Sequence, residues 1–177
     1  MMPRIQVAII VGSDSDLPII SSTVKTLDNL GIKSSVNVAS AHRTPQKVKQ
    51  CVRSAQSNGA EVFIAAAGMA AALPGVVASE TTQPVIGIPI EGKSLTGLDS
   101  LFSIVQMPPG IPVATVAIGK AGAVNAAVLA AEILSVKYRP IKAKLTAYRK
   151  KMALGIEKKD AALQKMGVEK YIESVKK

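Results

Sequence analysis

Residues with specialised chemistry are scarce in this sequence, which has one cysteine, one histidine, no tryptophan and only 3% aromatic residues. A single cysteine, Cys51, excludes an intramolecular disulfide and a cysteine-rich metal site, and we expect it to be an ordinary small core or half-buried residue. No apolar run approaches the roughly 18–20 residues that a bilayer span needs, and no hydrophobic signal segment precedes the first strand-like run. These absences favour a cytoplasmic protein without a membrane partner, whose core is aliphatic.

The length and the charge distribution limit the classes of function further. The 177 residues, 48% of them hydrophobic, fit one globular domain better than two and exclude wholesale disorder. Residues 1–136 are nearly neutral, with 9 Lys and Arg against 8 Asp and Glu, whereas residues 137–177 are strongly basic, with 13 against 4. This tail has neither a Gly/Arg tract nor a row of aromatic residues, and its lysines are spaced as on solvated helices. A nucleic-acid partner is therefore disfavoured.

Apolar runs alternate with amphipathic segments along the chain, a pattern typical of repeated βα units around a parallel sheet. It predicts a Rossmann-like or flavodoxin-like α/β sandwich with five strands and a C-terminal helical extension. The expected strands are 5–11, 36–39, 62–67, 84–89 and 113–118. The expected helices are 18–30, 44–58 with Thr44 as N-cap, about ten residues from Ala70, 98–105, 121–136, and 140–174 with interruptions near Gly155 and Gly167.

Ligands of such sheets gather outside the carboxyl ends of the strands, which makes the loops 12–16, 40–45, 68–75, and 108–110 with 119–122 the expected site. The first of these loops contains Gly12, Ser13, Ser15 and Asp16. Glycine permits a close backbone approach, the serine hydroxyls and helix amides suit a phosphate, and the carboxylate suits the hydroxyls of a ribose. The loop predicts a ribose-phosphate cradle, although an ordinary helix cap has the same composition.

The second loop contains His42, the only histidine, beside Arg43. A lone histidine is often structural or merely exposed. Here, however, a side chain whose proton moves near neutral pH stands next to a guanidinium that can grip a phosphate bidentately. We interpret the pair as a general acid/base next to a phosphate clamp.

The third loop, residues 67–75, offers only backbone and small apolar side chains. It could pack against a flat ring, or equally form a tight contact between a strand and a helix. Elsewhere the sequence has neither the residues of a metal site nor the nucleophile elbow of a serine hydrolase, so no metal is expected.

Together these loops resemble the PurE family, which acts on carboxyaminoimidazole ribonucleotide in purine biosynthesis. The similarity extends over about residues 5–137, and its last two segments are closest to the mutase branch of the family, class I. The matching segments are GSDSD (12–16), SAHRTP (40–45), AGMAAALPG (67–75), LDSLFSIVQMPPGIPV (98–113) and AIGKAGAVNAA (117–127).

The resemblance implies a three-layer α/β/α catalytic domain over residues 1–137, usually assembled as a homo-octamer. It also implies that residues 138–177 pack on a neighbouring subunit. It assigns proton transfer to His42 and substrate contacts to these segments, and it requires no cofactor. The implied substrate-binding residues are Gly12, Ser13, Ser15, Asp16, Ser40, Arg43, Gly68, Ala70, Ala72 and Leu73.

The implied reaction converts N5-carboxyaminoimidazole ribonucleotide to 4-carboxy-5-aminoimidazole ribonucleotide by decarboxylation, trapping of CO2 and recarboxylation at C4. Two departures from the family pattern stand in the third loop: Ala72 replaces a second histidine of the mutase branch, and Met69 replaces a usual glycine. Two alternatives therefore stay open. One is a carboxylase that takes aminoimidazole ribonucleotide and CO2 directly, and the other is a ribonucleotide-binding protein without catalysis.

Overall fold

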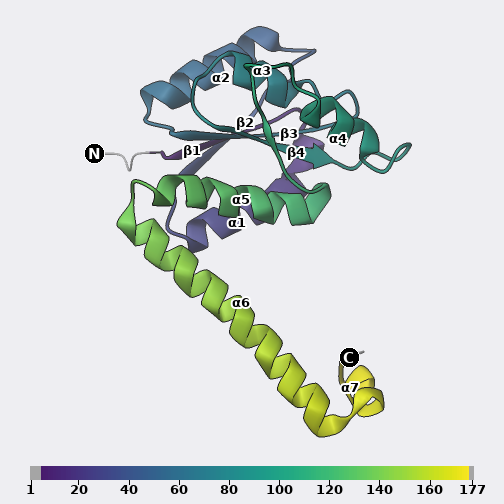
Figure 1. Cartoon of the computed structure of the whole chain (residues 1–177). Helices are drawn as coiled ribbons and strands as arrows, with labels where there is room; N and C mark the ends of the chain where they lie inside the picture. Colours follow the sequence, from purple (N-terminus) through teal and green to yellow (C-terminus); the bar gives the residue numbers. More distant parts are fainter. Residues whose placement is uncertain (1–4, 176–177) are drawn as a thin grey trace.

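The computed structural model describes residues 5–175, which form an α/β body and a helical arm that projects from it (Figure 1). The strands are β1 (Val7–Val11), β2 (Ser34–Val38), β3 (Val62–Gly68), β4 (Val85–Ile90) and β5 (Ala114–Thr115). The helices are α1 (Leu17–Asn29), α2 (Pro45–Ser57), α3 (Leu73–Ser79), α4 (Leu98–Val105), α5 (Gly119–Ser135), α6 (Arg139–Met166) and α7 (Val168–Val175), and a 3-10 turn, η1 (Asp14–Asp16), precedes α1.

The five strands form one parallel sheet in the order β2-β1-β3-β4-β5, with helices on both faces (Figure 1). The expected fold class, a three-layer flavodoxin-like sandwich, is thereby confirmed. Val38, Val11 and Ala66 lie side by side in the register, so the carboxyl ends of three strands are level. From β1 the chain goes to β2 on one side of the sheet and then crosses to β3 on the other side of β1. The boundary between β1 and β3 is therefore the topological switch point, where ligands of such folds bind.

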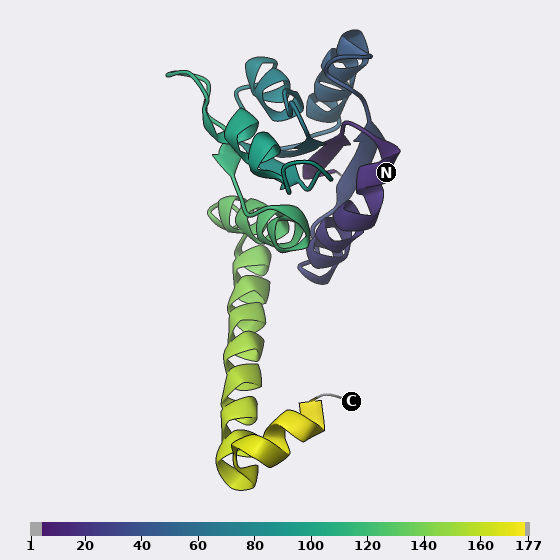
Figure 2. The same cartoon turned by 90° about the vertical axis from the view of Figure 1, so that its right-hand side faces the viewer.

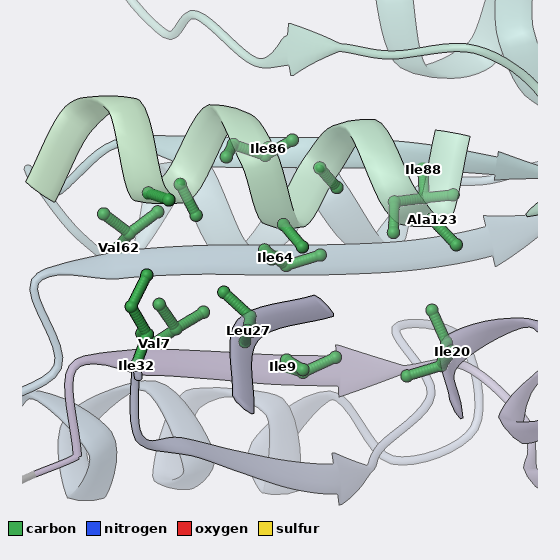
Figure 3. Packing of buried hydrophobic residues seen from close by; sticks show 14 of the residues in the cluster. Val7, Ile9, Ile20, Leu27, Ile32, Val62, Ile64, Ile86, Ile88 and Ala123 are labelled. Atoms are coloured by element: carbon green, nitrogen blue, oxygen red, sulfur yellow. The ribbon is translucent and has the colours of Figure 1, made fainter. Parts of the chain in front are cut away.

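Alternating side chains of each central strand enter two different cores. Val7 and Ile9 of β1 pack with Ile64 against α1 and α5, as Figure 3 shows, whereas Ala8 and Ile10 face α2, α3 and α4. Full burial of an aliphatic side chain of this size contributes about 1.5–3 kcal/mol, which is how a core almost without aromatic residues holds the sheet.

The element boundaries differ from the sequence expectations in several places. Strand β2 starts two residues early, at Ser34, because an exposed edge strand tolerates polar residues that carry no hydrophobic signal. Strand β5 pairs over only two residues rather than the expected six. Helix α3 begins at Leu73 instead of Ala70, since Met69 adopts a left-handed backbone conformation with φ of 57°.

The arm consists of the distal part of α6 together with α7, and both views show it extending away from the body (Figures 1 and 2). The first turns of α6 belong to the body, because Ile141 and Leu145 are buried in the core shared with α5. Glu61 accepts hydrogen bonds from Lys137, at 2.9 Å, and from the hydroxyl of Tyr138, which fixes the point where α6 leaves the body.

The interruption expected near Gly155 is wrong, because α6 continues through it; glycine costs a helix about 1 kcal/mol but does not end it. The interruption near Gly167 is confirmed, and there the residue has φ of 74° and separates α6 from α7. No helix within residues 5–175 has the length and apolar character to cross a membrane.

Candidate active site

A cleft of about 680 Å³ opens at the carboxyl edge of the sheet, across the switch point between β1 and β3. This volume suits a small organic ligand such as a mononucleotide. The loops that follow β1, β2, β3 and β4 supply its walls, so side chains far apart in the sequence share one cavity. Its lining comprises Gly12, Ser13, Ser15, Asp16, Ser40, Ala41, His42, Arg43, Ala67, Gly68, Met69, Ala70, Ala71, Ala72, Leu73, Ile90, Glu91, Gly92 and Lys93.

The loop after β1 is a small network of hydroxyl and carboxylate groups. The Oγ of Ser13 caps the 3-10 turn by accepting a hydrogen bond from the backbone N–H of Ser15 at 3.3 Å. The Ser15 hydroxyl lies 2.8 Å from this Oγ and 3.3 Å from Oδ1 of Asp16. The loop therefore presents two hydroxyls and a carboxylate in fixed positions, as binding of a sugar phosphate requires.

Asp16 is the least exposed charged residue of the cleft, with 9% of its surface accessible. Burial raises the pKa of its carboxyl above the ordinary 3.8, and the nearby charge of Asp14 acts in the same direction. Hydrogen bonds from the Ser15 side chain and the Ser13 backbone oppose the shift in pKa. Because this carboxylate is poorly solvated, hydrogen bonds donated by a ligand, such as those from the hydroxyls of a ribose, stabilise its charged form.

The loop after β2 forms a closed turn that presents His42 and Arg43. The Ser40 backbone N–H donates to Oγ1 of Thr44 at 2.9 Å, so Thr44 stabilises the turn rather than capping α2 with its side chain as expected. Nη2 of Arg43 donates to the carbonyl of Gly12 at 3.2 Å and ties this turn to the loop after β1. His42 is exposed and lines the cleft, so its ring is neither enclosed in a core nor remote from the serine and carboxylate groups.

The loop after β3 forms an uncharged wall of small residues. Ala71 and Leu73 are buried, and Ala72, the departure from the family pattern noted in the sequence, provides only a methyl group. Met69, with 71% of its surface exposed, has the positive φ that glycine adopts without strain, which explains why glycine is usual at this position. A ring or a CO2 molecule would meet no charge on this side of the cleft.

All eleven residues that the sequence analysis assigned to the site line this one cleft, from Gly12 to Leu73. That they bind a substrate stays a prediction. Of the other loops that the analysis considered, residues 108–110 and 119–122 contribute nothing to the lining found within residues 5–175.

The loop after β4 is the part of the cleft that the sequence analysis missed, although the same rule about strand ends applies to it. Glu91 and Lys93 bring two charges to the lining. The carboxylate of Glu91 lies against the first turn of α5, where a Cβ on Gly119 would be 3.1 Å from Oε1. The hydroxyl of the fully buried Ser100 lies 2.9 Å from the carbonyls of Ile90 and Gly97, which fixes both ends of the loop.

No group of three or more His, Cys, Asp or Glu side chains suited to a metal occurs in the part of the chain that the structure describes. The expectation that the reaction needs no cofactor is not tested by this observation. The residues that line the cleft can themselves supply proton transfer, charge pairing and desolvation.

Comparison with known proteins gives the same relationship from sequence and from structure. Residues 6–154 match the family model described as AIR carboxylase. The N5-carboxyaminoimidazole ribonucleotide mutase of Pyrococcus abyssi is 54% identical over 97% of both chains, and that of Pyrococcus horikoshii is 52% identical over 94% of this chain and 93% of its own. The crystal structure of Treponema denticola PurE superposes with a TM-score of 0.82 at 29% identity, covering 90% of this chain and 99% of that one. The chain therefore belongs to the AIR carboxylase family, the PurE family.

Proposed function

We propose that this protein is an N5-carboxyaminoimidazole ribonucleotide mutase, which moves a carboxylate from the exocyclic nitrogen N5 of the substrate to carbon C4 of its imidazole ring. The observation that carries the proposal is the meeting of a solvent-accessible imidazole, a guanidinium, a serine cluster and an uncharged wall in one cleft. Relatives about half identical over nearly their whole length bear this name, which supports the assignment.

The substrate lies with its phosphate at Ser13, Ser40 and Arg43, where hydroxyls and a guanidinium converge. Asp16 accepts hydrogen bonds from the ribose hydroxyls. With the phosphate and ribose bound in this way, the imidazole ring of the substrate lies over the uncharged wall formed by the loop after β3. Binding through the phosphate and ribose holds the reacting atoms in place, so that recarboxylation is effectively unimolecular.

His42 moves one proton twice. In the first step the bond between N5 and the carboxylate carbon breaks, CO2 leaves, and the electron pair left on N5 takes a proton from the imidazolium. In the second step C4 attacks the trapped CO2, and neutral His42 removes the proton from C4. The enzyme returns to its starting state, so no nucleotide triphosphate or cofactor is consumed, and one imidazole serves both steps.

The uncharged wall has a role in the interval between the two steps. CO2 carries no charge and is held only weakly, so its retention depends on a dry surface that leaves it beside C4. Residues 67–73 provide such a surface, because this segment has no ionisable side chain.

The purified protein tests the proposal with two substrates. We expect it to convert N5-carboxyaminoimidazole ribonucleotide well above its spontaneous rate of decay, and to show little turnover of aminoimidazole ribonucleotide with modest bicarbonate. The reverse preference would establish the direct carboxylase. If the protein binds one or both ribonucleotides but turns over neither of them, it is a binding protein.

The variant His42→Asn separates catalysis from binding. Because general acid–base catalysis contributes about 10²- to 10⁴-fold, turnover should fall by at least about a hundredfold while affinity for the ribonucleotide changes little. Ser57→Ala, on the distant end of α2, is the matched control and should leave turnover unchanged. Equal turnover of wild type and His42→Asn would refute the proposed proton transfer.

We also propose that the arm packs on a neighbouring copy in a cytoplasmic homo-octamer, with residues 1–137 as the catalytic unit and 138–177 as the extension. Met152, Leu154 and Ile156 of α6 and Ile172 of α7 are exposed apolar residues, and a second copy would cover them. Met152→Glu with Ile156→Glu should lower the mass measured by sedimentation, whereas Lys151→Glu should not. Identical masses would refute the packing.

A further inference from the structure

The ionisable groups that line the cleft are Asp16, His42, Arg43, Glu91 and Lys93. Two of these side chains are an arginine and a lysine, Arg43 and Lys93. They come from different loops, and the sequence analysis assigned a role only to the first. Lys93 is exposed at the rim of the cleft, where a lysine is free to pair with an anionic group of a ligand.

The sheet topology places these two cations on opposite sides of the cleft. Arg43 follows β2 and Lys93 follows β4, with β1 and β3 between them. Three strand spacings of about 4.8 Å separate the ends of β2 and β4 by about 14 Å. Arg43 is drawn inward by its hydrogen bond to Gly12, and the long lysine side chain can bridge part of the remaining gap.

Among the described residues, none forms an ion pair with Lys93. Neither Lys93 nor Glu91 belongs to a salt bridge within residues 5–175. Glu91 is turned toward the start of α5, against Gly119. The other carboxylate near the loop is that of Asp99, whose Oδ2 would lie 3.9 Å from a Cβ on Gly92, and it too forms no salt bridge with a described residue.

The ligand of the proposed function does offer a counterion. The product, 4-carboxy-5-aminoimidazole ribonucleotide, carries a phosphate at one end and a carboxylate on the imidazole at the other. With its phosphate at Arg43, its ring points toward β3 and β4. The wall from Met69 to Ala72 has no charge with which to bind a carboxylate. We propose that Lys93 binds the carboxylate of the ribonucleotide and so distinguishes carboxylated from uncarboxylated ligands; this rests on the proposed function.

The consequence is a cleft with two matched ends. Arg43 and the serines hold the phosphate of every ribonucleotide, whereas Lys93 responds only to the carboxylate. In this chain the charge that binds the carboxylate then comes from Lys93 in the loop after β4. Residue 72, an alanine, contributes only a methyl group to the lining. An ion pair of this kind orients the imidazole ring as well as adding affinity.

Calorimetric titration of the full chain with two ligands tests the assignment. The ligands are 4-carboxy-5-aminoimidazole ribonucleotide and aminoimidazole ribonucleotide, which differ by the carboxylate alone. Lys93→Gln should weaken binding of the first about five- to twentyfold and of the second less than about twofold, because a charged hydrogen bond to an accessible group is lost. Lys93→Arg should keep most of the preference. Lys33→Gln, at the opposite edge of the sheet before β2, is the matched control and should change neither affinity.

Equal losses for both ligands, or no loss for either, would overturn the role of Lys93. The proposed function can fail separately. If wild type does not interconvert the two carboxylated ribonucleotides but Lys93→Gln still loses the preference, the mutase assignment is refuted and the carboxylate site stands. If wild type interconverts them and Lys93→Gln keeps the preference, only the carboxylate site is refuted.

Discussion

Ser100 links the site to the stability of the fold, and replacing it with alanine is the sharpest structural test. Its hydroxyl is fully buried and lies 2.9 Å from the carbonyl oxygens of Ile90, at the end of β4, and of Gly97, before α4. A hydroxyl has one proton, so the two acceptors share it. Ser100→Ala removes that donor while the side chain shrinks by a single atom. The Gly97 carbonyl keeps the hydrogen bond from the Leu101 N–H at 2.9 Å, so the loss falls mainly on the Ile90 carbonyl.

The expected loss follows from the burial of this donor. A typical internal hydrogen bond contributes about 0.5–1.5 kcal/mol, and a buried acceptor left unpaired costs about 1–3 kcal/mol. Since one proton is lost and almost no volume, we expect the free energy of unfolding to fall by about 1–2 kcal/mol. For a chain of this length, that corresponds to a decrease in Tm of about 2–8 °C.

Thermal unfolding followed by circular dichroism, at equal protein concentrations, measures this decrease. The control is Ser103→Ala on the same helix, whose exposed hydroxyl donates to the Asp99 carbonyl at 2.7 Å and should contribute almost nothing to Tm. If both variants melt within a degree or so of each other, the buried hydrogen bond does not stabilise the end of β4, and our account of the loop after β4 is wrong.

Three further predictions concern single residues. Folding raises the pKa of Asp16, so this carboxyl stabilises the fold fully below pH 3.8 and loses that contribution as the pH rises through the raised pKa. Asp16→Asn should therefore gain Tm relative to wild type as the pH increases from about 3.5 to 7, and should lose ribonucleotide affinity; a constant difference in Tm across that range would contradict it. Met69→Gly should stabilise the protein by about 1 kcal/mol in urea unfolding, because it removes a side chain from a left-handed backbone; a loss of stability would show that the methionine side chain contributes more than the strain costs. Gly155→Ala should raise the free energy of unfolding by about 0.5–1 kcal/mol in the same assay, because alanine favours a helix more than glycine does and nothing lies within 4 Å of the added Cβ. Unchanged stability would show that the arm does not unfold together with the body.

Much of the fold could be predicted because the central strands are continuous aliphatic runs. Val7 to Val11 and Val62 to Ala67 have no other stable place than a sheet covered on both faces. Strand β5 and the start of α3 could not be predicted, because both depend on tertiary contacts. The two paired residues of β5 carry little pattern, and the left-handed backbone at Met69 is disfavoured for any residue with a side chain.

The site was predictable where chemistry and position coincided. Ser13 and Asp16 follow the buried strand β1, Arg43 follows the edge strand β2, and their side chains suit a ribose phosphate. Glu91 and Lys93 stand in the same relation to β4 but were missed, because a Glu and a Lys separated by glycine resemble an ordinary polar loop. Only the strand order, which places β4 two strands from β1, shows that this loop closes the same cleft.

The unequal distribution of charge between body and arm has a consequence for handling the protein in solution. Residues 137–177 hold almost the whole positive excess, so the body alone is close to its isoelectric point at neutral pH. Colloidal repulsion between molecules then originates mainly from this basic segment, the distal part of which forms the protruding arm, and it weakens as salt shortens its range. Preparations that lose this basic segment to proteolysis should precipitate near pH 7, whereas the intact chain remains dispersed at low ionic strength.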